Sequence, residues 1–252
     1  MGVILGPGSL KAYAHIGALR EFARARIPIH AITGLEWGAL IGGLYAQQGQ
    51  VNDAEWKAFK LKESDLPNEG GFLSSRLKPE SIGVMQGFID STFGNTSIER
   101  SKVEFGCPAF WSKQDRFGWM SKGPYKDAMR ACLPYPPFFT DNGGVFAAPF
   151  SVEEAAAHLR ARGANLIVLV NVLGQGEILS SRMASELSSD NLLWSEIRRE
   201  MLRAKSPSVH FVINVNTSGH PITDFGGRRA LMDAGAKSAA DVVNKMVSQY
   251  GF

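Results

Sequence analysis

Five consecutive residues, Gly34-Leu35-Glu36-Trp37-Gly38, have the spacing of a nucleophile elbow. In such an elbow a strand turns sharply into a helix, and small flanking residues allow a strained centre that presents a nucleophilic serine. The central residue here is Glu36 instead of serine. The sequence therefore predicts that the turn forms without the hydroxyl that would attack an ester.

A glycine-rich segment near the start of the chain is a second candidate site. Residues 6–9, GPGS, follow the apolar run 3–5 and precede apolar residues at helical spacing. Unpaired backbone N–H groups in such a loop bind anions, although Pro7 has no N–H to contribute. A serine just before a helical pattern is a common N-cap, so we expect the Ser9 hydroxyl to cap the helix. The residues expected to form this anion-binding loop are Gly6, Gly8, Ser9 and Lys11.

The apolar pattern predicts alternating strands and helices around both segments. Runs at 3–5 and 29–33 favour strands, whereas 10–26 and 37–47 have helical spacing. This order is typical of a parallel β-α-β-α unit. The run 165–173 is rich in Val, Leu and Ile, as in a strand that is buried on both faces.

Two stretches within residues 2–45, LGPGSLKAYAHIGALREF and AITGLEWGALIGGLYA, resemble the opening of patatin-like phospholipases. That family has a glycine-rich oxyanion loop ending in a basic residue, then an Ala-His-Ile-Gly helix, then a Gly-x-Ser-x-Gly elbow. In this resemblance Lys11 matches the basic residue, and His15 belongs to the helix, where its role is structural. The similarity continues through 101–140 and a final amphipathic helix that ends near Tyr250.

The resemblance implies an α/β fold, a patatin-like three-layer sandwich with a mostly parallel central sheet and helices on both faces. The length of 252 residues, 44% of them hydrophobic, is enough for one domain that covers 1–252. Neither a cofactor nor a metal site is expected.

The second member of the family's catalytic pair is an aspartate in an Asp-Gly turn after a strand, and two alignments are possible for 140–149. In the first, Asn142 takes the place of the aspartate. In the second, which fits better, 141–143 is a hairpin turn, 144–147 is a strand, and Ala148 takes that place. Neither residue is a carboxylate base. Loss of both the serine and the aspartate predicts a pseudoenzyme with no catalytic residues.

Glu36 itself has three possible roles. Its carboxylate accepts hydrogen bonds from the 6–9 loop or pairs with Lys11, filling the place of an ester oxyanion, or it points to water. The third role is that of a nucleophile, which needs a histidine positioned as general base. The available histidines are His15, His30, His158, His210 and His220.

Trp37 stands where the family has a small residue, so its indole either narrows the cleft or packs on a neighbouring helix. The aromatic and proline-rich segment 135–139, together with Phe72 and Leu73, is a candidate rim for acyl chains, and core packing explains it equally well.

We expect a non-catalytic protein that binds a lipid, a small ligand or a protein partner through the former active-site cleft. The alternative is a structural or regulatory protein that acts through its surface, including as a homo-oligomer. A weak lipid acyl hydrolase with a non-standard site is the third reading.

The charge of the chain limits the classes of partner that we expect. The formal net charge of +3 is too small to indicate nucleic acid. Basic clusters at 198–205 and 228–229 suit solvated helices or peripheral contact with an anionic membrane.

Cys107 and Cys132 lack metal-site spacing and are expected to be reduced, buried thiols. No apolar run reaches about 20 residues, and no signal peptide is visible. We therefore expect a cytoplasmic protein, unless an export segment has been removed.

Overall fold

The computed structural model describes residues 1–67, 78–203 and 208–252. Its strands are β1 (Gly2–Leu5), β2 (Ala31–Gly34), β3 (Glu104–Trp111), β4 (Arg116–Met120), β5 (Val145–Ala147), β6 (Ile167–Gln175) and β7 (Phe211–Asn216). Its α-helices are α1 (Ala14–Arg24), α2 (Trp37–Gln48), α3 (Val51–Ala58), α4 (Gln86–Phe93), α5 (Tyr125–Cys132), α6 (Val152–Ala161), α7 (Ser181–Glu186), α8 (Ser188–Arg203) and α9 (Arg228–Tyr250). Short 3-10 turns η1 to η5 cover Ser9–Tyr13, Glu63–Asp65, Ile82–Met85, Ile98–Arg100 and Ser112–Gln114.

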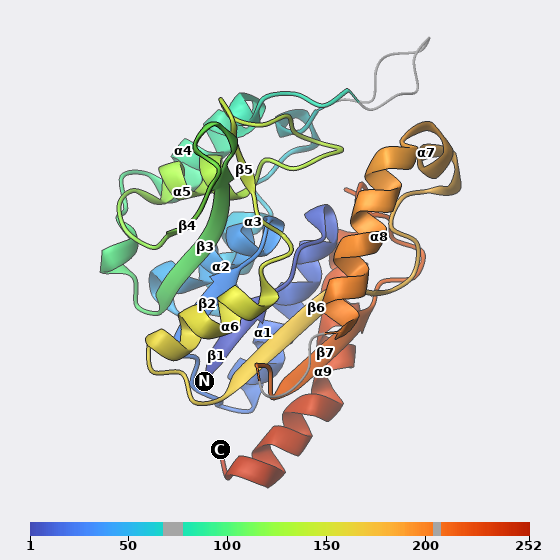
Figure 1. The fold of residues 1–252 in the computed structure, drawn as a ribbon. Helices are drawn as coiled ribbons and strands as arrows, with labels where there is room; N and C mark the ends of the chain where they lie inside the picture. The colour runs from blue at the N-terminus through green and yellow to red at the C-terminus, as the bar shows by residue number, and fades with distance from the viewer. Residues whose placement is uncertain (68–77, 204–207) are drawn as a thin grey trace.

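The strands form one sheet in the order β4-β3-β2-β1-β6-β7 (Figure 1). From β3 to β7 the neighbours are parallel, whereas β4 and β5 both pair antiparallel with β3. The first part of β3 pairs with β2 and its last three residues pair with β5. The expected mostly parallel sheet is confirmed, and the antiparallel pair lies at one end of it.

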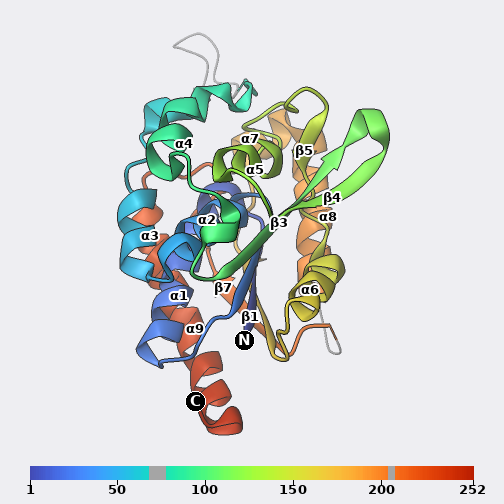
Figure 2. The same ribbon diagram turned by 90° about the vertical axis from the view of Figure 1, so that its left-hand side faces the viewer.

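Helices cover both faces of the sheet, as Figure 2 shows: α1, α2, α3 and α9 lie on one side, and α6 and α8 on the other. Helix α2 is apolar around its whole circumference, and its residues from Trp37 to Gln47 are buried. Such a helix belongs in a core. The expected α/β sandwich with helices on both faces is thus confirmed. The sequence also placed the first strands and helices correctly within a few residues.

Close backbone packing joins α1 to α9. A Cβ atom on Gly17 would lie 1.9 Å from the carbonyl oxygen of Met232, and one on Gly235 would lie 1.9 Å from that of Ala14. These distances leave no room for any side chain, so each helix presents a glycine where the other passes. The contact fixes α1, which follows directly from the glycine-rich loop.

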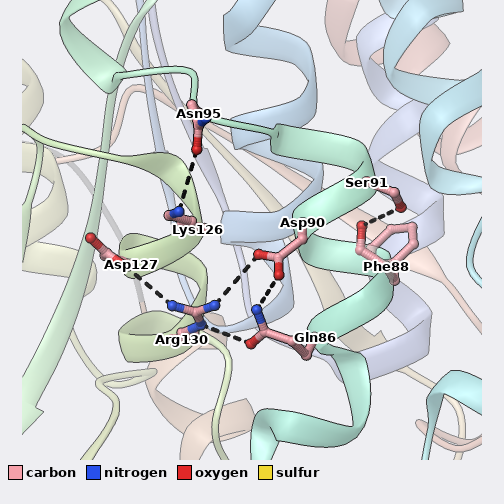
Figure 3. A network of polar contacts seen from close by, with 8 residues as sticks. All are labelled: Gln86, Phe88, Asp90, Ser91, Asn95, Lys126, Asp127 and Arg130. Atoms are coloured by element: carbon pink, nitrogen blue, oxygen red, sulfur yellow. Dashed lines mark hydrogen bonds and ion pairs between the residues drawn. The ribbon is translucent and has the colours of Figure 1, made fainter.

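Helix α5 is held to α4 by the side chain of Arg130 (Figure 3). Its guanidinium donates to Gln86 Oε1 at 3.1 Å, to Asp90 Oδ1 at 3.4 Å and to Asp127 Oδ1 at 3.5 Å. These groups are partly exposed, so the network positions α5 more than it stabilises the fold.

Cys107 on β3 and Cys132 at the end of α5 form a disulfide, with their Cα atoms 6.1 Å apart. The expectation of two reduced thiols was therefore wrong. The two cysteines are 25 residues apart in sequence, and only the packing of α5 on β3 brings them together. Within the described ranges, no cluster of three potential metal ligands occurs, and no helix is both long and apolar enough to cross a bilayer.

Candidate functional site

The elbow forms where the sequence placed it, between the end of β2 at Gly34 and the start of α2 at Trp37. Glu36 has φ 50° and ψ −125°, a conformation that is strained for a residue with a side chain. A Cβ on Gly34 would lie 2.3 Å from Ala39 Cα, and one on Gly38 would lie 2.1 Å from Leu5 O. Both outer glycines are thus required by backbone contacts.

The glycine-rich loop follows β1 and lies directly beside the elbow, because Leu35 N donates to Leu5 O at 2.9 Å. Ser9 has a left-handed φ of 45°, so the loop and the elbow each contain one strained residue. The η1 turn that begins at Ser9 has Gly8 as its N-cap and no side-chain cap. The expected capping role of the Ser9 hydroxyl is therefore wrong.

The carboxylate of Glu36 occupies the loop. Gly8 N and Ser9 N donate to its Oε2 atom at 3.1 and 2.9 Å, and Ser9 Oγ donates to its Oε1 atom at 3.1 Å. Glu36 has no exposed surface. Of the alternatives, the hydrogen-bonded one holds, and a carboxylate that points to water is excluded.

The environment of Glu36 favours its neutral form. Burial raises the pKa of its carboxyl group to about 7, although the N–H groups of Trp37, Ser9 and Gly8 oppose this by binding the charged form. A carboxyl with this pKa exists in both protonation states near neutral pH.

Lys11 does not pair with Glu36. Its ammonium donates to Glu177 O at 2.6 Å and to Thr217 Oγ1 at 2.9 Å, and the side chain is fully buried. Burial, with the nearby Arg198, lowers the pKa of Lys11 to about 8, and Glu177 opposes the shift. Glu177, Thr217 and Arg198 were missed in the sequence, because no local pattern connects positions so far apart.

His15 has a structural role, as the resemblance implied. Its Nε2 lies 2.8 Å from Gly6 O, which can only accept, so this nitrogen carries the proton. Burial lowers the pKa of His15 to about 4 and keeps the ring neutral. In the described ranges every histidine has a partner other than Glu36. The other partners are Arg162 O for His30, Arg162 for His158, Ile167 N for His210 and Asp224 for His220. No hydrogen bond among the described residues joins a histidine to Glu36.

The segment 140–149 contains a tight turn that leads into β5. Asn142 N donates to Val145 O at 2.7 Å and Val145 N donates to Asn142 O at 3.2 Å, with Gly143 and Gly144 at positive φ between them. Strand β5 ends at Ala147, so Ala148 is the first residue after it. The strand and the alanine that follows it are as the second alignment expects, whereas a turn centred on Gly143 and Gly144 is what the first alignment expects. The position that replaces the family's aspartate therefore stays a prediction.

Comparison with known proteins decides the family. Residues 3–160 match the family model of patatin-like phospholipases. The chain belongs to the patatin-like phospholipase family.

Relatives of this patatin-like chain include lysophospholipases. Lysophospholipase nte1 of Emericella nidulans is 26% identical over 208 residues, which cover 79% of this chain and 13% of that protein. Lysophospholipase NTE1 of Coccidioides immitis is 27% identical over 179 residues, or 68% of this chain and 11% of that protein. The chain therefore spans only a small part of the length of these relatives.

A solved structure with the same fold is VipD from Legionella pneumophila. Its TM-score is 0.56 at 11% identity, and the match covers 97% of this chain and 66% of that one. At this level of identity the likeness shows the fold alone.

Trp37, the bulky residue after the patatin-like elbow, is fully buried. Its ring lies 6.2 Å from that of Phe138, and its indole nitrogen has no hydrogen-bond partner in the described part of the chain. The indole therefore packs against the proline-rich segment.

An apolar cavity of about 480 Å³ lies beside that segment. It is lined by Pro79, Pro134, Tyr135, Pro136, Phe139, Thr140, Asp141, Phe146 and Leu193. Three residues of the expected acyl-chain rim, Tyr135, Pro136 and Phe139, thus line a cavity. Phe72 and Leu73 lie outside the described residues.

Proposed function

We propose that this chain is a non-catalytic member of the patatin-like phospholipase family. The observation that carries the proposal is the set of bonds from Gly8 and Ser9 to Glu36. In an ester hydrolase these N–H groups must be free to stabilise the oxyanion that develops on the substrate. Here a side chain of the protein itself already holds them.

The bond from Ser9 Oγ to Glu36 suggests one catalytic alternative, in which Ser9 is the nucleophile and Glu36 its base. A base with a pKa near 7 would suit that role. The same carboxylate, however, accepts both N–H groups that the oxyanion would need. Glu36 cannot serve as the base and leave these donors free in one geometry, which argues against this alternative.

The burial of the elbow limits the ways in which such a protein can bind a ligand. Glu36 and Trp37 have no exposed surface, so a ligand has no access to the elbow in this conformation. This favours a structural or regulatory role exerted through the surface, including contact with a protein partner. The apolar cavity beside the proline-rich segment supports a second candidate function, binding of a lipid or acyl chain.

Ester hydrolysis tests the absence of catalysis. With short-chain and long-chain acyl esters, we expect the wild type and Glu36→Ala to give the same rate as buffer. The double variant Glu36→Ser with Ala148→Asp is expected to exceed the wild type and each single variant, because it restores the nucleophile and places an acid after β5. Wild-type turnover that Glu36→Ala abolishes contradicts the proposal. If Ser9→Ala abolishes it as well, the Ser9–Glu36 pair is the catalyst.

Dodecanoate binding tests the cavity. Leu193 lines it, so Leu193→Trp is expected to fill it and weaken binding at least tenfold. Leu192→Trp is the matched control, because Leu192 is 64% exposed and does not line the cavity. Calorimetric titration of the three proteins provides the measurement. Equal affinities in all three exclude the cavity as the acyl-chain site and leave the surface role.

A further inference from the structure

The contacts of Glu36 engage both oxygens of its carboxylate. Two N–H groups, from Gly8 and Ser9, converge on Oε2, and the Ser9 hydroxyl donates to Oε1. The two N–H groups converge on one oxygen, as the donors of an oxyanion hole do. The hydroxyl adds a donor to the second oxygen, and the three donors together suit a planar carboxylate.

The loop that supplies these donors is held by contacts that do not involve Glu36. Gly6 N donates to Val170 O at 3.0 Å, and Leu10 N donates to Ile222 O at 3.0 Å. These bonds tie the two ends of the loop to β6 and to the segment before α9. The donors are therefore expected to keep their positions when the side chain of Glu36 is shortened.

The nearby cation does not define the site. The Lys11 ammonium is bound to Glu177 O and Thr217 Oγ1, and the described contacts of Glu36 include no positive charge. Recognition at the loop therefore depends on hydrogen-bond geometry, which distinguishes a carboxylate from a halide ion.

We propose that Gly8 and Ser9 form a carboxylate-binding site whose resident ligand is the side chain of Glu36, and that the site binds a free short-chain carboxylate once that side chain is removed. Glu36→Ala deletes a methylene carbon and a carboxyl group, which are the heavy atoms of acetate. Glu36→Gly deletes one carbon more, which gives the heavy atoms of propionate. The two variants should therefore prefer ligands that differ by one carbon.

Thermal unfolding in sodium acetate, compared with sodium chloride at equal ionic strength, tests the proposal. A ligand that binds only the folded state raises the midpoint with its concentration. We expect acetate to raise the midpoint of Glu36→Ala, and propionate that of Glu36→Gly, each more than the other acid does. The wild type and Glu36→Gln keep the site filled and should not respond.

Two further measurements serve as controls for this test. If Glu36→Ala folds poorly, Glu36→Gly is the second variant, because glycine tolerates the φ of 50° at this position, and refolding yield in propionate becomes the readout. Adding Ser9→Ala to Glu36→Ala removes one donor and should weaken the acetate response. The proposal is overturned if Glu36→Ala and Glu36→Gly respond to the two acids no more than Glu36→Gln does.

This inference rests on the proposed function only in treating Glu36 as a fixed occupant of the loop. The two fail separately: esterase activity of the wild type contradicts the absence of catalysis, whereas a missing carboxylate response contradicts the binding site and leaves the hydrolysis result unchanged.

Discussion

Replacing Glu36 with glutamine is expected to stabilise the protein increasingly as the pH rises. Burial raises the pKa of Glu36 from 4.5 to about 7 in the folded state. Between these values the folded protein keeps a proton that the unfolded chain has released, so this group lowers the stability of the wild type as the pH rises through the window. Glutamine does not titrate. The free energy of unfolding of Glu36→Gln relative to wild type should therefore rise by about 3 kcal/mol from pH 4.5 to pH 8.

The difference between the two proteins is the quantity to measure, because other groups titrate in the same range. Burial lowers the pKa of both His15 and His158 to about 4, and these groups act in the opposite direction, with stability gained as the pH rises toward their unfolded value of 6.5. They are present in both proteins and cancel in the difference. Urea unfolding at several pH values gives that difference. A difference that stays constant with pH would show that the loop N–H groups hold Glu36 ionised at its ordinary pKa.

The sequence predicted the loop and the elbow well because their requirements are local. Gly34 and Gly38 stand where any Cβ would meet backbone atoms, and the short strand and apolar helix on either side follow from the pattern of neighbouring residues. The hypothesis that Glu36 binds the loop also depended only on two adjacent strand-to-helix turns. That adjacency follows from the parallel pairing of β1 with β2.

Features that depend on distant segments could not be predicted in this way. Pairing of Lys11 with Glu36 was one of the alternatives, but its partner Thr217 is 206 residues away, in the segment after β7. The disulfide depends on how α5 packs against β3. The N-cap rule failed at Ser9 because the turn begins at Ser9 itself, with Gly8 as its N-cap, and the Ser9 hydroxyl donates to Glu36. In each case the local pattern was consistent with the wrong partner, and tertiary contacts selected the right one.

Gly38→Ala is expected to destabilise the protein by about 3 kcal/mol, at the upper end of what an overpacked core usually costs. The added Cβ would lie 2.1 Å from Leu5 O and 2.8 Å from Gly6 O. Both are backbone atoms, so relief requires α2 to move away from the end of β1. That movement separates Glu36 from Gly8 and Ser9, and the pH dependence that Glu36 confers should weaken together with the stability.

Gly87→Ala is the matched control for this substitution. Gly87 is also a helical glycine, in α4, and a Cβ there would meet nothing within 4 Å. Alanine has the higher helix propensity, so this variant should be as stable as the wild type or more stable by up to about 1 kcal/mol. Urea unfolding of both variants separates a general effect of alanine from the backbone clash. If Gly38→Ala proves as stable as Gly87→Ala, the elbow and the end of β1 can move apart at little cost in free energy. The contact between Glu36 and the loop is then not a fixed part of the fold.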